Sequence, residues 1–294
     1  IDLGPQLESR DYVGLEEQAW ARPANSLLLE EDPSLPDTLQ SGAYSYANPV
    51  LSDDGSILLY LSDGATEADR LDVTKTRVAA TVRMGDDNSF PEGTRMDQAG
   101  AASENATMKV DTNNVSDGYG DNSLRVAGNN QFAAAVWVRQ MEDYTKEVDT
   151  GSALTDGQQD LQLRSTEIVA GIYDRMRDDW TLYQLTNNSS PDLAPVAATN
   201  GTRTIVAWRE VSSSSAEHIT TFDQQDTIRY AIYDKTSGWQ KTEDGAIDVQ
   251  TLYTGDGASA VKGIEAAMLK DGTAAVVYTL DTDASNDLNT DWET

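Results

Sequence analysis

The stretch VAATNGTRTIVAW, residues 196–208, decides the fold class, because its pattern occurs three more times in the chain. In each copy a short apolar strand precedes a turn with Gly or Asn, and a second apolar strand follows and ends in an aromatic residue. The other copies are NPVLSDDGSILLY (48–60), RVAGNNQFAAAVW (125–137) and AAMLKDGTAAVVY (266–278). Their final aromatic residues are spaced by 77, 71 and 70 residues. A long and nearly constant period indicates a repeat architecture.

Two of the repeats share a second pattern after the strand-end aromatic residue. Ile-Tyr-Asp occurs at 172–174 and at 232–234, and Trp180 and Trp239 follow. An apolar segment comes next in both repeats, at 181–185 and at 249–253. Each unit therefore reads as four strands, expected in the third unit at 195–199, 203–210, 227–234 and 248–254. In the first unit the third strand is expected at 77–84, and a Gly-, Asn- and Asp-rich tract over 85–122 obscures the fourth.

These strands predict an all-β protein. The apolar runs are about five to seven residues long and are bounded by Gly, Asn or Asp, which disfavours helices. Four-stranded antiparallel units repeated around an axis are the blades of a β-propeller. A β-sandwich could use similar strands, but it would not require the same aromatic and Ile-Tyr-Asp positions to recur in the same order. We therefore predict a β-propeller of four-stranded antiparallel blades that is incomplete in this chain.

The repeat also divides the chain. We expect an N-terminal extension over 1–47, with a closing strand at 26–30 and a short helix at 7–20. The blades are expected at 48–122, 123–192 and 193–262, with a partial blade at 263–294. The pattern stops after the second strand of the fourth copy, which predicts that this chain is a fragment or a cleavage product whose partner supplies further blades.

The order of these patterns resembles the blades of secreted bacterial β-propellers of the sialidase-like, Asp-box type. The resemblance covers about 48–280 and rests on Ala-Trp at the end of the second strand, Tyr-Ala-Ile-Tyr-Asp at 230–234 and the Trp-bearing turn that follows. An Asp-box has the form Ser-x-Asp-x-Gly-x-Thr-Trp. In 233–239 the Asp and the Gly lie further apart, and 173–180 has no Gly. A sialidase also needs an arginine triad, a Tyr-Glu pair and an Asp acid, and no such set can be assigned.

Charge and cysteine content narrow the classes of function. The chain has 50 acidic and 21 basic residues, giving a net charge of −29, and it has no cysteine. Such a field repels phosphate backbones and anionic membrane surfaces and attracts cations. We therefore expect no nucleic-acid binding. No run approaches the ~18 apolar residues needed to span a bilayer, so we expect no membrane insertion either. Without cysteine there is no disulfide framework, thiolate nucleophile or zinc–thiolate site.

The candidate ligand-binding residues lie on one face of the predicted propeller. The two longest connections, 140–165 and 211–225, both join a second strand to a third strand, so they emerge on the same face. Long loops on a rigid scaffold often carry binding sites. Arg139 and Arg209 follow the strand-end aromatic residues, and their guanidinium groups could bind carboxylates. With the neighbouring loop residues, the predicted ligand-binding set is Arg139, Tyr144, Arg209, Glu210, His218 and Phe222.

Calcium is the candidate metal, because clustered carboxylate oxygens are its preferred ligands. The densest group contains Asp281, Asp283 and Asp287, and a second group contains Asp117 and Asp121. Neither has the full spacing of a calcium loop with its terminal Glu. The recurring Asp174 and Asp234 are better explained as turn formers, since an Asp at the end of a strand accepts hydrogen bonds from its own turn.

These observations favour a non-catalytic, extracellular or cell-surface propeller module that acts in adhesion, scaffolding or ligand binding. The expected partner is an extracellular glycan or protein, or the remaining blades of the same assembly. The lone His218 supports no Ser-His-Asp triad and no His-rich metal site. The alternative is part of a sialidase-like glycoside hydrolase or a polysaccharide lyase whose active-site residues lie partly in other blades. A third reading is a structural subunit whose last blade edge forms an interface.

Overall fold

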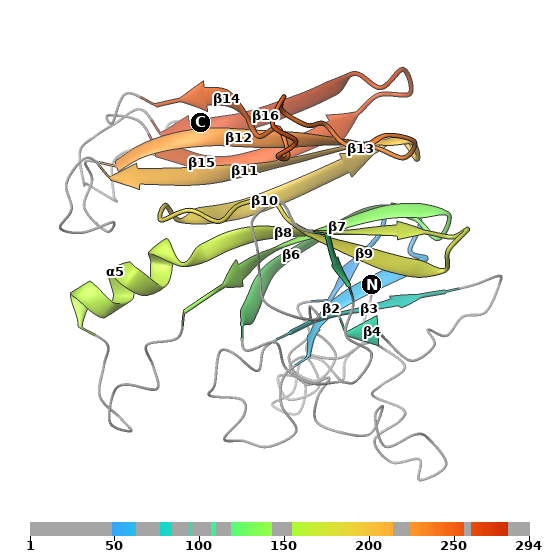
Figure 1. The fold of residues 1–294 in the computed structure, drawn as a ribbon, viewed down its shortest axis with the longest axis horizontal. Helices are drawn as coiled ribbons and strands as arrows, with labels where there is room; N and C mark the ends of the chain where they lie inside the picture. Colours follow the sequence, from blue (N-terminus) through green and yellow to red (C-terminus); the bar gives the residue numbers. More distant parts are fainter. Residues whose placement is uncertain are drawn as a thin grey trace, which may run out of the picture.

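The computed structural model describes residues 49–62, 77–83, 94–95, 107–109, 119–142, 155–213, 224–255 and 260–281. Within these residues nearly all regular structure is β-strand, in four antiparallel sheets. The sheets follow one another along the chain and lie face to face, from β1–β4 below to β15–β16 above in Figure 1. The all-β fold built of successive antiparallel blades is therefore confirmed.

The first sheet has the order β1-β2-β3-β4, and its strands are Val50–Leu51, Ile57–Ser62, Arg77–Val82 and Thr94–Arg95. β3 lies where the sequence predicted the third strand. The fourth position, which the Gly-, Asn- and Asp-rich tract obscured, is taken by β4, which pairs with Ala79 and Ala80. The N-terminal strand and helix predicted within 1–47 lie outside the described residues.

The second sheet is a four-stranded meander with an added edge strand, in the order β5-β9-β8-β7-β6. The meander strands are Gly120–Asn129 (β6), Phe132–Gln140 (β7), Thr166–Asp174 (β8) and Asp179–Gln184 (β9). β5, Thr107–Lys109, precedes them in sequence but pairs with the outer edge of β9. The connection between β7 and β8 is not only a loop, because it contains the helix α5, Asp156–Arg164.

The third and fourth sheets follow the same order of strands. The third contains β10 (Asp192–Thr199), β11 (Arg203–Ser213), β12 (Gln224–Asp234), β13 (Gly238–Trp239) and β14 (Gln250–Thr254). Its fourth position is divided, because β13 and β14 both pair with β12. The fourth sheet contains β15 (Ala260–Met268) and β16 (Ala274–Asp281) within the described residues.

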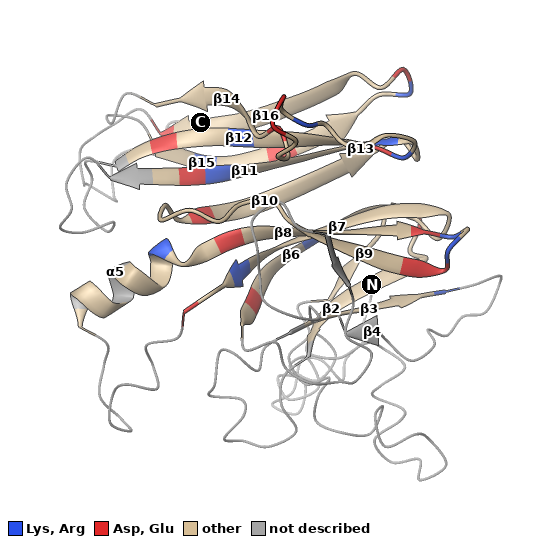
Figure 2. Ribbon diagram, viewed as in Figure 1, with Lys and Arg blue, Asp and Glu red and all other residues tan. Residues whose placement is uncertain are grey.

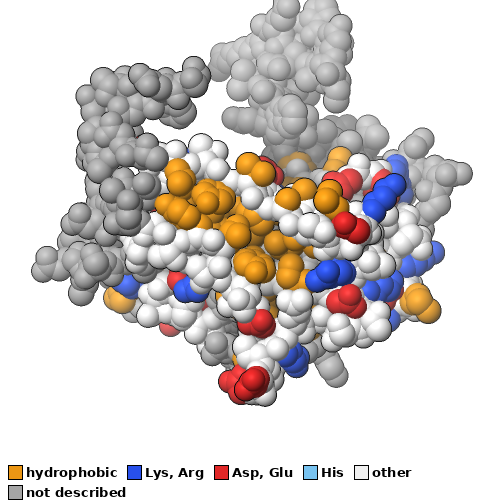
Figure 3. Space-filling model, turned by 90° about the horizontal axis from the view of Figure 1, so that it is seen from above, with side chains coloured by type: hydrophobic (Ala, Val, Ile, Leu, Met, Phe, Trp, Pro, Cys, Tyr) orange, Lys and Arg blue, Asp and Glu red, His pale blue; other side chains and the backbone are white. Residues whose placement is uncertain are grey.

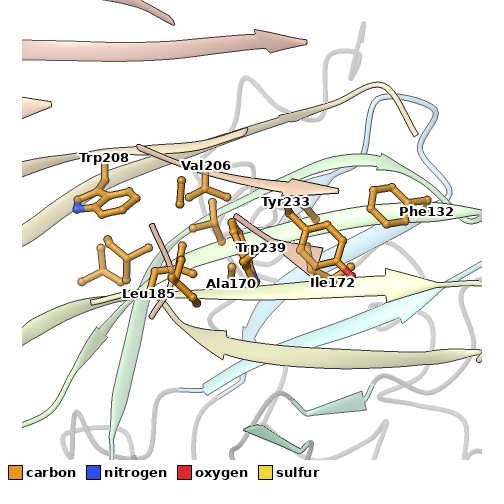
Figure 4. Packing of buried hydrophobic residues seen from close by; sticks show 14 residues of the cluster. Phe132, Ala170, Ile172, Leu185, Val206, Trp208, Tyr233 and Trp239 are labelled. Carbon is orange, nitrogen blue, oxygen red and sulfur yellow. The ribbon is translucent and has the colours of Figure 1, made fainter. Parts of the chain in front are cut away.

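Central strands are buried on both faces, which explains their continuous apolar sequence. In β7, Ala133, Ala135 and Trp137 pack toward the first sheet. The alternating residues Ala134 and Val136 pack toward the third sheet. Figure 4 shows the layer between the second and third sheets, where Trp208 and Val206 from β11 face Ala170 and Leu185. Burying both faces at about 25 cal/mol per Å² makes these layers the main stabilising contacts.

The turns between the first and second strands are stabilised by the same side-chain-to-backbone hydrogen bond in each copy. The side-chain oxygen of Asp54, Asn129, Asn200 or Asp271 accepts a hydrogen bond from a backbone N–H two residues further on. Asp174 and Asp234 do the same between the third and fourth strands. The prediction that these two aspartates form turns is therefore confirmed, and the Gly/Asn/Asp signal marks one end of every blade.

Among the described residues, no helix has the length and apolarity needed to cross a membrane.

Candidate functional site

Buried polar side chains gather at one end of the blades. This end is where β7 and β11 finish and where β8 and β12 begin, so it carries the connections toward α5 and between β11 and β12. The figure coloured by charge shows Lys, Arg, Asp and Glu at the strand ends and mostly uncharged residues in the middle of the strands (Figure 2). We call this the loop-bearing end. Its buried polar residues are Asp121, Arg139, Thr166, Glu167, Gln184, Thr186, Asp192, Asp226 and Thr227.

One hydrogen bond recurs in two neighbouring blades at this end. The indole Nε1 of Trp137 donates to Asp121 Oδ1 at 2.9 Å, and Nε1 of Trp208 donates to Asp192 Oδ1 at 2.8 Å. In both cases the aspartate is the first or second residue of the first strand and lies 16 residues before the tryptophan. All four residues are buried. The bond therefore joins the first two strands of a blade at the point where each blade meets the one before it.

A β-bulge accompanies each of these aspartates. The register of β6 on β7 shifts between Asn122 and Arg125, and that of β10 on β11 shifts between Leu193 and Val196. Ser123 and Ala194 lie within the shifts and have positive φ values of 56° and 50°. Residues other than Gly rarely adopt this conformation, and it costs about 1–3 kcal/mol. Because the strained bulge occurs at the same place in two blades, we infer that the contacts of the aspartate hold it in position and offset the cost of the strain.

In the second blade the aspartate also binds an arginine. Arg139 Nε lies 2.9 Å from Asp121 Oδ1, and both side chains have an exposed fraction of 0%. The guanidinium carbon of Arg139 is also 5.7 Å from the centroid of the Tyr119 ring. Arg139, a predicted ligand-binding residue, thus forms an ion pair with the carboxylate of Asp121. Asp121, a predicted calcium ligand, is bonded to Trp137 and Arg139 at the same time.

In the third blade two further arginines are paired. Arg209 lies 2.8 Å from the buried Asp226, and Arg229 lies 2.8 Å from Glu210. Asp226 also accepts a hydrogen bond at 2.6 Å from the backbone N–H of Val261, in the first strand of the next blade. The side chains of Arg209 and Arg229 keep exposed fractions of 24% and 30%. Both guanidinium groups are therefore partly exposed to solvent and ion-paired to the blade, Arg209 near the loop-bearing end and Arg229 in the middle of β12.

Asp192 lies close to two other acidic side chains, those of Glu167 and Glu210. Burial raises the pKa of Asp192 well above its usual range, and the nearby Glu167 raises it further, against the lowering effect of the Thr186 hydroxyl. Asn188 bridges the two acids: its side chain donates to Asp192 Oδ2 at 3.2 Å, and its backbone N–H donates to Glu167 Oε1 at 2.9 Å. Asp192 is thus disposed to keep its proton at a pH where exposed aspartates are ionised.

The raised pKa of Asp192 predicts a pH-dependent stability difference. The folded state binds the Asp192 proton more tightly than the unfolded state does. This side chain therefore favours folding most at low pH and loses that contribution as pH rises from about 4 through its folded pKa. We expect Asp192→Asn to gain stability relative to the unmodified chain as pH rises, by up to about 1.4 kcal/mol per pH unit. Urea denaturation of both proteins between pH 4 and 8 measures this; a difference that does not change with pH contradicts it.

The remaining predicted site residues divide into two groups. Glu210 and Asp281 are described and lie at the loop-bearing end, where Glu210 binds Arg229 and Asp281 lies 3.3 Å from Lys262. The others lie outside the described residues, so their place in the fold stays a prediction: Tyr144, His218, Phe222, Asp117, Asp283 and Asp287. Within the residues the structure does describe, no group of three or more His, Cys, Asp or Glu side chains is arranged to hold a metal ion.

Several residues of this end were not predicted from the sequence. Asp192, Glu167 and Asp226 sit among 50 acidic residues, so their type alone carried no signal. A usable signal for Asp192 was its distance of 16 residues from Trp208, the same as that from Asp121 to Trp137. Arg229 was hidden in the middle of a strand, where its pairing with Glu210 depends on the register of β11 and β12.

Fold and site together define a β-propeller-type protein with a polar, loop-bearing end. No family model matches the sequence, and no curated protein matches it. Similar solved structures include the α-L-arabinanase of Penicillium chrysogenum complexed with arabinobiose, with 9% identity, a TM-score of 0.34 and coverage of 78% of this chain and 57% of that chain. The GH93 α-L-arabinofuranosidase of Fusarium graminearum with arabinobiose has 12% identity, a TM-score of 0.34 and coverage of 76% and 54%. A Trypanosoma rangeli sialidase mutant has 7% identity, a TM-score of 0.29 and coverage of 55% and 28%. The chain spans little more than half of the first two structures.

Proposed function

We propose that this chain is a non-catalytic, extracellular or cell-surface β-propeller module that binds a glycan or a protein at its loop-bearing end. The observation that carries the proposal is the internal pairing of charged side chains at that end, in Asp121–Arg139, Asp226–Arg209 and Glu210–Arg229. These pairs hold the strand ends in fixed positions beneath the connections. A rigid base that presents long loops is the usual arrangement of a binding surface.

The electrostatics restrict the ligand. With a net charge of −29, the chain repels polyanions at long range, so neutral glycans and neutral or basic protein surfaces fit best. Arg209 and Arg229 reach solvent through their partly exposed side chains and can donate hydrogen bonds to hydroxyl or carbonyl oxygens. Calcium held by acidic loop residues stays part of this proposal, since a cation would offset the local negative charge.

The proposal predicts that binding depends on the connection between β11 and β12. Ser213 and Gln224 are partners in the strand register, so a two-residue Asn-Gly turn can replace 214–223 without moving either strand. We expect this variant to lose at least about 10-fold in affinity for the glycans that the unmodified chain retains on an immobilised panel, which corresponds to about 1.4 kcal/mol. Its melting temperature should change little, because the ladder below the turn is kept.

The matched control is altered at the opposite end of the same blade. Lys241 and Glu243 are exposed in the turn between β13 and β14, and replacing both with Ser should leave glycan retention unchanged. Loss of glycan retention in this control, but not in the shortened-loop variant, would place the binding surface at the end opposite to the loop-bearing end and would contradict the proposal. Retention of the same glycans by both variants would also contradict the proposed surface.

A glycoside hydrolase is the second candidate, and Asp192 is the observation that favours it. A carboxyl group with a raised pKa beside Glu167 and Glu210 is the type of group that serves as a general acid. Against it, Asp121 makes the same bond to a tryptophan in the preceding blade, as a structural residue would. Incubation with aryl glycosides distinguishes the two: a hydrolase releases the aryl group and Asp192→Asn abolishes the release, whereas a binding module releases none.

A further inference from the structure

The second and third blades share the aspartate–tryptophan bond, but a different residue lies opposite the aspartate in each. In the strand register, the residue directly opposite Asp121 is Arg139, and the residue directly opposite Asp192 is Glu210. Opposite residues of an antiparallel pair lie on the same face of the sheet, and like charges there destabilise the pair. The aspartate of the second blade therefore has a counter-charge at this position, whereas the aspartate of the third blade has another acid.

A further acid reaches Asp192 from the neighbouring blade. Asn188 donates from its side chain to Asp192 Oδ2 at 3.2 Å and from its backbone N–H to Glu167 Oε1 at 2.9 Å. Asp192 and Glu167 have exposed fractions of 0% and 1%. On the outer face above β14 and β16, by contrast, acidic side chains reach solvent and several lie beside Lys or Arg (Figure 3). Two buried carboxyl groups bridged by one residue cannot both be ionised without a large cost.

Basic groups lie around this acid pair, but among the described residues no Lys or Arg is ion-paired with Asp192. Asp192 accepts instead from neutral donors, the Trp208 indole, the Thr186 hydroxyl and the Asn188 amide. The surrounding charged groups are Glu167 of β8, which lies opposite Arg139 of β7, Glu210 of β11, which binds Arg229 of β12, and Arg164 of α5, which donates to the Ser189 carbonyl at 3.5 Å. A bound proton is therefore what neutralises Asp192 in the folded chain.

We propose that Asp192 and Glu167 share a proton and form a pH-dependent switch at the junction between the second and third blades, whereas the Asp121–Arg139 pair stays charged. Glu167 belongs to the second blade and Asp192 to the third. When the proton is released to water, like charges remain on both sides of the junction. Water entry or separation of the strand ends then lowers their repulsion. The junction is tightest below the titration midpoint and loosens above it, whatever ligand the loop-bearing end binds.

The indole signals of two equivalent tryptophans test the titration, because each indole N–H donates to one of the two aspartates. In the full chain with isotope-labelled indoles, the nuclear magnetic resonance signal of Trp208 should shift between about pH 5 and 9, with a midpoint above the ordinary Asp pKa of about 3.9. The Trp137 signal should stay constant over this range. Single Trp→Phe substitutions assign the signals. A Trp208 signal that does not titrate, or a Trp137 signal that titrates with the same midpoint, would overturn the proposal.

Two variants of equal charge change show whether the neighbouring acid sets the midpoint. Glu167→Gln keeps an acceptor for the Asn188 backbone N–H and removes the adjacent charge, so the proton affinity reported by Trp208 should fall at least about 10-fold. Glu243→Gln removes an acid in the exposed turn between β13 and β14 and should leave the midpoint unchanged. Asp192→Asn should abolish the titration. Equal shifts from the two Gln variants would assign the midpoint to the general field of the acidic chain and contradict the shared proton.

Amide hydrogen exchange tests the loosening of the junction in the unmodified chain. The N–H of Ile168 bonds to the Thr186 hydroxyl at 2.8 Å, and the N–H of Leu185 bonds to the Ile168 carbonyl at 2.8 Å. After correction for the intrinsic pH dependence of exchange, opening at these amides should increase by up to about 10-fold per pH unit above the midpoint. The N–H of Lys235, bonded to the Thr202 carbonyl at the other end of the third blade, is the control and should not follow. Constant opening at Ile168 and Leu185, or an equal increase at Lys235, would show that no switch operates at this junction.

Discussion

Replacing Asp121 with Ala is expected to lower the free energy of unfolding by about 3–5 kcal/mol, because it removes the carboxylate of a buried ion pair. Arg139 and Asp121 are both fully buried and lie 2.9 Å apart, so water cannot replace the lost carboxylate. The same change removes the acceptor of the Trp137 indole. Urea denaturation at neutral pH measures the loss.

Two further variants separate the ion pair from its neighbours. Arg139→Met in the Asp121→Ala background should recover part of the lost stability, because it removes the buried positive charge and keeps an apolar side chain of similar length. Asp174→Ala is the exposed comparison: Asp174 pairs with Lys235 at 3.1 Å, but both side chains are partly exposed, so the expected loss is about 1 kcal/mol or less. An Asp121→Ala loss as small as that of Asp174→Ala would contradict the buried pair and would return both residues to the candidates for ligand or calcium binding.

The second large effect is expected at Trp208. Trp208→Ala should lower the free energy of unfolding by about 3–5 kcal/mol, because it opens a cavity between the second and third sheets. The side chain is fully buried and packs with Val206, Ala170 and Leu185. The substitution also removes the hydrogen bond from the indole N–H to the buried Asp192. Thermal or chemical denaturation followed by tryptophan fluorescence and circular dichroism measures the change.

A matched pair of substitutions isolates the hydrogen bond of Trp208. Trp239 belongs to the same buried layer, but its Nε1 has no hydrogen-bond partner among the described residues. Trp208→Phe and Trp239→Phe therefore remove the same atoms, and the Trp208 change should cost about 1–3 kcal/mol more, because it leaves a buried acceptor with one donor fewer. Equal losses at the two positions would show that the Asp192–Trp208 bond contributes nothing to stability.

The strands of the blades could be predicted from the sequence because their signals are local. The Gly, Asn and Asp residues that mark the turns act within two or three residues, as the bonds of Asn200 to Thr202 and Asp234 to Thr236 show. The continuous apolar runs between the turns are typical of strands that are buried on both faces. For this reason 203–210 and 227–234 were predicted within the observed β11 and β12.

Features that depend on contacts distant in sequence could not be predicted. The strand β5 lies in a tract without periodic pattern, and its pairing with β9 joins Thr107 to Tyr183. The bulges place Ser123 and Ala194 at positive φ. Neither residue is Gly, so the residue type at these positions did not indicate a bulge. Asp121 and Arg139 are partners in the register of β6 on β7, beyond the bulge, so their ion pair depends on that register.

One missed element did carry a local signal. The helix α5 begins with a capping box, in which Thr155 accepts from the backbone of Gln158 and the side chain of Gln158 accepts from the backbone of Thr155. The pattern Thr-x-x-Gln before 156–164 is a recognised helix start. The connection over 140–165 was predicted as a long loop, and the structure corrects this over 156–164.

The central claim is that the charged groups at the loop-bearing end support a binding surface and perform no turnover. The most direct test is to incubate the full chain, and separately Asp192→Asn, with the glycans it retains and to compare glycan masses before and after. The account predicts unchanged masses with both proteins and equal retention by both. Shortened glycans that form with the unmodified chain and not with Asp192→Asn would contradict it and would identify Asp192 as a catalytic acid.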